Sequence, residues 1–382
     1  MLDVLIAGAG PAGAIAARAL ALSGARVLMV DRERFPRDKL CGDTLNPGAI
    51  RLLAEAGLTG GALATGLPIA GMRVTGPHAS VVAPYRQHQH GVSLLRRDLD
   101  AWLVEQAVAA GARFESGLTA QSALTLESDG MPAVRGLILR DRSGAVTRMP
   151  ASVTIAADGR RSAVARSVGL GSSPTAPRRW AYGGYFPLEA GESQTSGPVF
   201  GEMHVRSGWY AGVIRVPGDL VNVCVVVEHP EHGGVPLALM RHYLGRDPEL
   251  RRRFGDQTPI GPLTVLGPLA VDMPNPGVPG LLLAGDAAGF IDPMTGDGLN
   301  LAMRGALLAA DEATRVLESG DWTGAVERLK DRRMAAIGSK LRFNRWVRAL
   351  TASPISVRTA GLAARIAPGL VRRLVVAAGD AA

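Results

Sequence analysis

The chain has 382 residues, of which 47% are hydrophobic and 20% are charged, enough for a large core divided between two domains. Its two cysteines, Cys41 and Cys224, form no disulfide framework, which favours a reducing compartment and a cytoplasmic location. Glycines, a proline and Arg18 interrupt the apolar first thirty residues, so we expect a strand–turn–helix–strand there and neither a signal peptide nor a membrane span. No later stretch reaches the roughly eighteen apolar residues of a spanning helix.

The net charge of +8 is concentrated near the C-terminus. Residues 328–379 contain twelve Lys and Arg but a single acid, Asp331, so this stretch carries +11 and the remainder carries −3. Interleaved apolar side chains such as Phe343 and Trp346 predict a helix with one apolar and one cationic face. Two alternatives stay open: peripheral contact with the inner face of a membrane, or packing on the rest of the protein. Nucleic-acid binding is not expected, because no reader motif accompanies the charge.

Hydrophobic patterns predict alternating strands and helices in the first part of the chain. The expected elements are strands over 2–7, 26–31 and 152–157, and helices over 12–23 and 96–110. The pattern changes between about 178 and 272, where alternating stretches predict antiparallel strands. These strands cover 199–205, 209–216 and 221–228, with a turn at 217–219. A buried strand over 280–285 and a helix over 298–318 then return to the first pattern.

This order predicts one domain that is interrupted by another. The expected first domain comprises 1–168 and 273–327, and the inserted sheet comprises 169–272 with part of 68–95. The basic helical region covers 328–382. The predicted fold class is therefore α/β: a Rossmann-like (GR2-type) dinucleotide-binding domain with an inserted antiparallel β-sheet and a C-terminal helical segment.

The strongest local motif is a glycine-rich turn between the first strand and the first helix. Gly8 permits the tight turn, Gly10 lets the backbone approach a pyrophosphate, and Gly13 lets helix and strand pack closely. The helix N-terminus, with Ala12 in its first turn, offers N–H groups to phosphates. Asp31, at the end of the next strand, is expected to accept a hydrogen bond from a ribose hydroxyl. This motif predicts dinucleotide binding but does not separate FAD from NAD.

A second motif, Gly285-Asp286-Ala287-Ala288, lies between a buried strand and a long helix. With the residues that follow it, this segment resembles the flavoprotein family that includes para-hydroxybenzoate hydroxylase and the geranylgeranyl reductases. The resemblance implies that Asp286 binds the ribityl chain of FAD, although a helix N-cap is its simpler interpretation. It also implies that the following turn and helix start contact the flavin, where a helix N-terminus stabilises negative charge near N1. The residues concerned are Pro293, Gly296, Gly298, Leu299 and Asn300.

The same resemblance implies further FAD contacts elsewhere in the chain. Asp158 stands in an Asp-Gly signature, Arg96 matches an arginine that reaches the pyrophosphate, and Ala120 matches a backbone contact to the adenine. Arg32, directly after Asp31, is assigned to the cofactor with them.

The segment Phe35-Pro36-Arg37-Asp38-Lys39-Leu40-Cys41-Gly42-Asp43 resembles a Pro-Arg-x-Lys-x-Cys-Gly segment of the geranylgeranyl reductases. The resemblance implies that Cys41 lies beside the flavin, as the one tentative catalytic residue, and that Arg37, Gly42 and Thr44 contact the cofactor. Its cations also suit a pyrophosphate. A small buried residue is the simpler interpretation of Cys41, and Cys224 is assigned to the core.

These motifs predict an FAD-dependent oxidoreductase similar to the geranylgeranyl reductases. It would reduce a carbon–carbon double bond of an apolar, isoprenoid-like substrate, with NAD(P)H as the expected electron donor. The alternative within enzymes is an NAD(P)H-dependent flavin monooxygenase of an aromatic or polyketide-like metabolite, and a non-redox alternative is structural FAD. Flavin-dependent halogenases are disfavoured, because the stretch 208–213 lacks their Trp-x-Trp-x-Ile-Pro segment. No metal site is expected, since His88 and His90 lack acidic or Cys neighbours.

Overall fold

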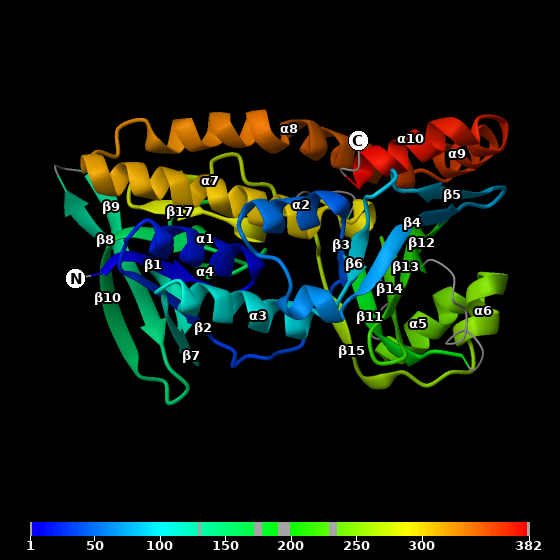
Figure 1. Cartoon of the computed structure of the whole chain (residues 1–382), viewed down its shortest axis with the longest axis horizontal. Coiled ribbons are helices and arrows are strands. Elements are labelled where there is room, and N and C mark those ends of the chain that lie inside the picture. The colour runs from blue at the N-terminus through cyan, green and yellow to red at the C-terminus, as the bar shows by residue number, and fades with distance from the viewer. Residues whose placement is uncertain (1, 129–130, 172–177, 190–198, 229–234, 380–382) are drawn as a thin grey trace.

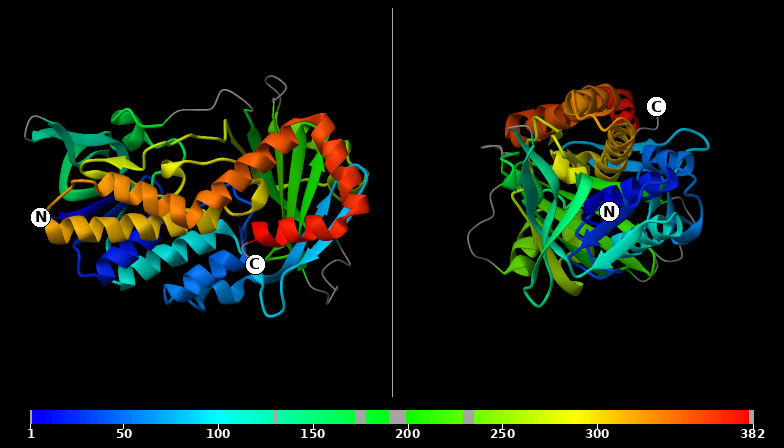
Figure 2. Two further views of the ribbon diagram at one scale, coloured as in Figure 1. Left: turned by 90° about the horizontal axis from the view of Figure 1, so that it is seen from above. Right: turned by 90° about the vertical axis from the view of Figure 1, so that its left-hand side faces the viewer.

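The computed structural model describes residues 2–128, 131–171, 178–189, 199–228 and 235–379. Two β-sheets lie one beyond the other along the long axis of the molecule, and the C-terminal helices run along one side of both (Figure 1). A view from that side shows the long helices crossing from the first sheet to the second (Figure 2). The structure therefore joins the two sheets through a shared helical layer.

The first sheet has a parallel centre, in the order β17-β10-β1-β2-β7, with β16 antiparallel at its edge. Its strands are β1 (Leu2–Ala7), β2 (Val27–Asp31), β7 (Arg113–Ser116), β10 (Val146–Ala156), β16 (Gly277–Val278) and β17 (Leu281–Leu283). The four strands predicted for this domain are confirmed, although the last is shorter than expected. Strand β10 begins earlier because its first half pairs with an unpredicted hairpin, β8 (Thr119–Ser128) and β9 (Met131–Arg140).

Both faces of the parallel sheet are covered, which is why its strands read as continuous apolar runs. Val4 and Ile6 of β1 belong to the cluster that packs against α1 (Pro11–Leu22), α3 (Arg96–Ala109) and α7 (Gly298–Ser319). Leu5 and Ala7 point the other way, into the cluster formed with β8, β9 and α4 (Ala163–Ser167). The helices predicted at 12–23, 96–110 and 298–318 are thus confirmed.

The second sheet has the order β15-β11-β14-β13-β12-β4-β6-β3, with β5 beside β4. Its strands are β3 (Thr44–Leu45), β4 (Leu67–Thr75), β5 (Ser80–Pro84), β6 (Gly91–Ser93), β11 (Trp180–Pro187), β12 (Val199–Arg206), β13 (Trp209–Val216), β14 (Leu220–Val227) and β15 (Ile260–Leu266). The predicted antiparallel pairing holds except between β12 and β4, which are parallel. Four of these strands come from residues 44–93, and the exact domain limits stay a prediction.

One face of the second sheet is covered by two short helices, α5 (Pro236–Gly245) and α6 (Pro248–Phe254). Four alternate valines of β14, from Val221 to Val227, pack against them. Because side chains alternate along a strand, Asn222, Cys224 and Val226 point to the opposite face. That opposite face looks toward the first sheet and forms part of the site described below.

The C-terminal region is helical, as expected, but it forms three helices: α8 (Ala325–Ala352), α9 (Pro354–Ile366) and α10 (Pro368–Ala378). Prolines start α9 and α10, where their missing N–H groups cost little. Helix α8 packs on α7, and the buried Glu312 accepts two hydrogen bonds from Arg328 there, at 3.0 and 2.8 Å. In the described part of the chain, no helix has the length and apolar character that crossing a membrane requires.

Short elements complete the connections. They are α2 (Pro47–Glu55) and the 3-10 turns η1 (Gly61–Thr65), η3 (Gly285–Ala288) and η4 (Pro293–Thr295). Helix α2 is capped by Asn46, whose side chain accepts from Ala49 N and donates to Asp297 at 2.8 Å. That second bond ties α2 to the start of α7.

Gly13→Ala tests the close approach within the first motif. A Cβ at Gly13 would lie 1.9 Å from the carbonyl oxygen of Gly8, a backbone atom that cannot move aside. We expect the free energy of unfolding of the apoprotein to fall by at least about 3 kcal/mol, despite the higher helix propensity of alanine. Gly369→Ala, where a Cβ meets nothing within 4 Å, is the control. Equal denaturant midpoints for the two variants would contradict the packing argument.

Candidate functional site

A cavity of about 630 Å³ lies between the two sheets. All the predicted cofactor residues except Gly13 and Asn300 line it. They are Gly8, Gly10, Ala12, Asp31, Arg32, Arg37, Cys41, Gly42, Thr44, Arg96, Ala120, Asp158, Asp286, Pro293, Gly296, Gly298 and Leu299. Gly13 packs against Gly8, and Asn300 is buried in α7. Motifs separated by almost 300 residues therefore meet in one place.

The glycine turn forms one end of this cavity. Gly8 has φ +94°, and a Cβ there would lie 2.3 Å from the carbonyl oxygen of Ala157. Gly10 precedes α1, which starts at the cavity without a side-chain cap. Uncapped N–H groups at a helix start are suited to an anion. This end of the cavity fits a pyrophosphate.

Cationic side chains gather beside the turn. The buried Asp100 accepts hydrogen bonds from Arg96 Nε and Nη2, both at 2.8 Å, and pairs with Arg37 Nη2 at 3.0 Å. Arg37 Nη1 is buried and has no hydrogen-bond partner within the described residues. A buried guanidinium with a donor left over indicates a missing acceptor, and phosphate oxygens supply one. Arg96, predicted to reach the pyrophosphate, is thus held in the wall by Asp100.

Asp31 ends β2 next to the turn. Its Oδ2 accepts from Ala9 N at 2.8 Å and its Oδ1 accepts from Glu33 N at 2.9 Å. Each carboxylate oxygen can accept a second bond, so the carboxylate that braces the turn keeps capacity for a ribose hydroxyl. Arg32 and Ala120 stand beside it in the wall.

Asp286 lies in the cavity wall near several cationic side chains. Burial raises the pKa of its carboxyl, and the nearby cations Lys39, Arg96 and Arg160 oppose that rise. Burial, together with Arg96 and Arg37, lowers the pKa of Lys39. Lys39 and Arg160 line the cavity but were not assigned to the cofactor from the sequence. Lys39 stands inside the quoted segment Phe35 to Asp43 and Arg160 follows Asp158 by two residues, and their charge is the signal that could have pointed to this cavity.

The turn before α7 is held rigidly against the cavity. Asp292 Oδ1 accepts from Tyr210 Oη at 2.7 Å and Met294 N at 3.1 Å, while its Oδ2 accepts from Arg179 Nη1 at 2.8 Å. Gly296 then adopts φ +69°, the left-handed conformation that favours glycine. Helix α7 starts here without a side-chain cap, which fits the negative charge of a reduced flavin.

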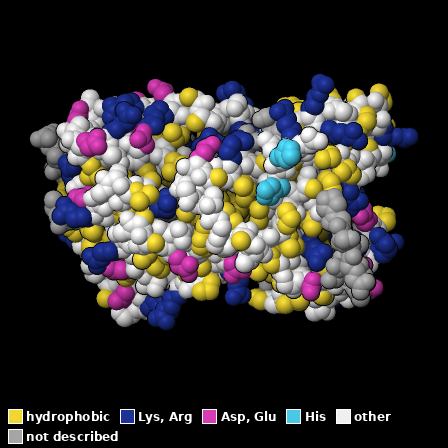
Figure 3. All heavy atoms as spheres, in the orientation of Figure 1, with side chains coloured by type: hydrophobic (Ala, Val, Ile, Leu, Met, Phe, Trp, Pro, Cys, Tyr) yellow, Lys and Arg dark blue, Asp and Glu magenta, His cyan; other side chains and the backbone are white. Residues whose placement is uncertain are grey.

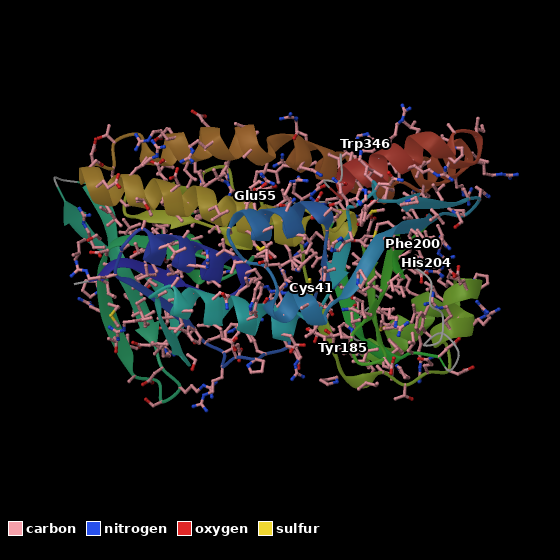
Figure 4. The ribbon with its side chains drawn as sticks, viewed as in Figure 1. Cys41, Glu55, Tyr185, Phe200, His204 and Trp346 are labelled. Carbon is pink, nitrogen blue, oxygen red and sulfur yellow. The ribbon has the colours of Figure 1, made fainter. Side chains whose placement is uncertain are left out.

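Cys41 lies in the wall between the two sheets, as Figure 4 shows. Its carbonyl oxygen accepts from Asn222 Nδ2 at 2.8 Å, and burial raises the pKa of its thiol. Cys224, assigned to the core from the sequence, lines the same cavity instead. It shares the strand face of Asn222, and a polar residue within an apolar strand was the available signal for that face.

Asp43, two residues after Cys41, connects the second sheet to the start of α3. Its Oδ2 accepts from Tyr185 Oη at 2.7 Å and Asn222 Nδ2 at 2.5 Å, and its Oδ1 accepts from Arg96 N at 3.1 Å. Burial raises the pKa of Asp43 to about 6, and these hydrogen bonds oppose the rise. Neither Asp43 nor Asn222 was assigned a role from the sequence.

A second, apolar cavity of about 250 Å³ lies between the second sheet and the C-terminal helices. Its walls include Ile69 and Val81 from the sheet and Trp346, Ala364 and Leu374 from α8, α9 and α10. Five residues line both cavities, so the two spaces adjoin: Thr44, Met72, Met203, Met294 and Gly296. The helices of the basic region thus do pack on the protein, and their inner faces enclose an apolar space.

Glu202, His204 and Glu249 lie close enough to share an ion, the one such group found among the described residues. Arg73 forms ion pairs with both glutamates, and Arg253 pairs with Glu202 at 2.9 Å. These arginines already neutralise the carboxylates, and Figure 4 shows His204 in the second sheet, away from Cys41. We keep the prediction that the chain has no metal site.

Asp43→Asn tests the buried carboxyl group. The folded pKa of about 6 lies above the ordinary value of 3.8, so the folded state binds the proton more tightly between these values. Relative to Asp43→Asn, wild type should lose up to about 3 kcal/mol of unfolding free energy as pH rises from 4 to 7. Denaturant titrations at several pH values measure this difference.

Asp141→Asn is the matched control, because hydrogen bonds from Ser143 lower the pKa of that exposed carboxyl. Relative to Asp141→Asn, the unfolding free energy of wild type should rise with pH and not fall. Parallel stability curves for wild type and Asp43→Asn would show that Asp43 has no raised pKa.

Comparison with known proteins shows similarity to flavoproteins. Residues 1–187 match the FAD binding domain family. The chain is 29% identical to a digeranylgeranylglycerophospholipid reductase of Methanothermobacter thermautotrophicus, over 86% of this chain and 82% of that one. It is also 29% identical to the menaquinone reductase of Mycobacterium tuberculosis, over 81% and 76% of the two chains.

A solved structure supports the fold over nearly the full length. The flavin-dependent brominase Bmp2 superimposes with a TM-score of 0.83 at 21% identity, covering 99% of this chain and 93% of that one. At that identity the likeness concerns architecture alone. The chain is thus an FAD-dependent oxidoreductase that matches the FAD binding domain over residues 1–187, and it is similar to the digeranylgeranylglycerophospholipid and menaquinone reductases.

Proposed function

We propose that this protein uses FAD to reduce a carbon–carbon double bond in an apolar, isoprenoid-like substrate, with NAD(P)H as the reductant. The observation that carries the proposal is the apolar cavity that adjoins the cofactor cavity through five shared residues. An apolar substrate chain in the second cavity would have one end at the five shared residues, where it would face the cofactor cavity. The names of two relatives, a reductase of isoprenoid lipids and a reductase of menaquinone, point to the same substrate class.

The positions of the predicted cofactor residues support the following proposed roles. Gly10, the start of α1, Arg37 and Arg96 would hold the pyrophosphate, and Asp286 would accept from the ribityl hydroxyls. FAD, when bound and reduced, supplies a hydride to one carbon of the double bond, and a proton must reach the other carbon. The protein then has to orient the chain, exclude water and keep a proton available.

The boundary between the cavities is suited to orienting the substrate. Three of its five residues are methionines, Met72, Met203 and Met294. Thioether side chains are flexible and polarisable, so they can close around an unsaturated chain. Beyond them the wall is made almost entirely of apolar side chains, and these exclude water.

We further propose that Cys41 is the flavin-proximal residue that tunes reactivity. Because burial raises its pKa, its thiol keeps the proton at neutral pH. Asn222 holds its backbone in place and is itself held by Asp43. Cys41 is thereby a fixed, protonated group in the cofactor wall.

The FAD site is tested with Asp286→Ala. We expect wild type to be purified yellow, with non-covalent FAD, and the variant to lose at least about tenfold in FAD affinity through lost charge-assisted hydrogen bonds. Absorbance and fluorescence titration of the apoproteins with FAD measure both. The exposed Asp311→Ala is the control and should bind FAD like wild type. A colourless wild-type protein that ignores added FAD would disprove the proposal.

The reaction is tested with reduced enzyme and polyprenyl lipids, with products weighed by mass spectrometry. We expect each turnover to add two hydrogens to the substrate without consuming oxygen. Oxygen consumption coupled to an oxygenated product would instead establish the monooxygenase.

Variants of the two cavities refine this assay. Ala364→Phe, which fills the apolar cavity away from the cofactor, should lower kcat/KM at least tenfold for a long polyprenyl chain and much less for a short one. Its FAD content should match wild type. Cys41→Ser should keep FAD and change kcat. An equal loss of kcat/KM for the long and the short substrate would show that the polyprenyl chain does not bind in that cavity.

A further inference from the structure

Helix α9 exposes an apolar ridge to solvent. Ile355, Leu362 and Ile366 are 77, 50 and 86% exposed, and Ile355 and Ile366 are large apolar residues with almost no cover. At 100° per residue the three side chains fall within about 40° of one another on the helix. Leu370 at the start of α10 extends the ridge with 58% exposure. We call these four residues the apolar ridge.

Cations border the apolar ridge. Arg358 and Arg365 of α9 and Arg372 and Arg373 of α10 are all exposed. No acidic residue occurs between Arg332 and Gly379. Figure 3 shows dark-blue side chains set among yellow ones at this corner of the molecule. Exposed aliphatic side chains flanked by cations, in a stretch of chain without acidic residues, complement a lipid bilayer, whose interior is apolar and whose surface can be anionic.

The inner faces of the same helices line the apolar cavity. Val357, Ala360 and Ala364 of α9, with Leu374 and Val375 of α10, are among its lining residues. Each helix therefore has one face toward the cavity and another toward solvent, and it forms the layer between them. The apolar ridge lies on the outside of the wall whose inside would hold the substrate.

We propose that the apolar ridge and its arginines dock on an anionic lipid bilayer, with the aliphatic side chains in the acyl boundary and the guanidinium groups at the phosphates. The substrate would then pass from the bilayer to the adjoining cavity, a step that rests on the proposed function. Docking itself rests on the surface alone. The helices lie on the bilayer and do not cross it.

Vesicle flotation of the full chain tests docking without measuring activity. With vesicles of phosphatidylglycerol and phosphatidylcholine at low salt, we expect wild type to float. The bound fraction should fall about tenfold on neutral phosphatidylcholine vesicles or in high salt, because salt screens the cationic contribution.

Two variants separate the apolar and cationic contributions. Ile355→Ser/Leu362→Ser/Ile366→Ser and Arg358→Gln/Arg365→Gln/Arg373→Gln should each lower the partition coefficient at least about tenfold. Control variants change exposed residues of other elements: Leu22→Ser/Val108→Ser/Val146→Ser and Arg142→Gln/Arg148→Gln/Arg252→Gln. Both controls should stay within about twofold of wild type, and circular dichroism should be unchanged in all four.

Three results would overturn the proposal. In the first, the wild-type protein does not float with anionic vesicles. In the second, the ridge variants float as well as the wild type. In the third, a ridge variant changes the sedimentation coefficient of the protein but not its flotation. The last result would make the ridge a contact between copies of this chain. Reduction of detergent-dispersed substrate is measured separately, so a protein that reduces it but does not float would refute docking while leaving the proposed function intact.

Discussion

The buried carboxylate of Asp43 is the contact that joins the second sheet to the start of α3, at the wall of the site. It accepts hydrogen bonds from Arg96 N at the start of α3, from Tyr185 of β11 and from Asn222 of β14. Three segments that are distant in sequence thus share one acceptor that is 1% exposed. Since an unsatisfied buried donor is costly, moving the start of α3 away from the second sheet here would lower the stability of the protein. The carbonyl oxygen of Cys41, two residues earlier, accepts a hydrogen bond from the same Asn222 side chain.

In the nearby wall of the cofactor cavity, cationic side chains outnumber the carboxylates that pair with them. Asp100 satisfies part of Arg96 and Arg37, yet Arg37 keeps a buried donor without a partner among the described residues. Lys39 and Arg160 add further positive charge near Asp286. An isolated protein bears a desolvation cost for such a group. The phosphates of a bound dinucleotide would offset this desolvation cost. The cavity therefore suits an anion.

The C-terminal helices connect this site to the apolar cavity. Arg179 donates to Asp292 in the turn before α7 and also to Thr351 Oγ1 of α8, at 3.0 Å. Lys340 of α8 donates to Ala378 O at the end of α10, at 3.0 Å. The wall of the apolar cavity is therefore bonded to the turn that fits the flavin. These hydrogen bonds give α8 and α10 a structural role beyond covering apolar surface.

By itself the sequence determined the parallel sheet and its helices, and nearly all the residues that it predicts for the cofactor line one cavity. Glycine turns such as Gly8–Gly13 have a local cause, in backbone angles and close approach, that a short motif carries completely. Only the tertiary structure decided what lines the second half of the site. The placement of Cys224 on a cavity wall, the parallel pairing of β12 with β4 and the apolar cavity under α9 and α10 all depend on contacts between distant segments. Periodicity shows which side chains share a face, and packing alone decides what that face meets.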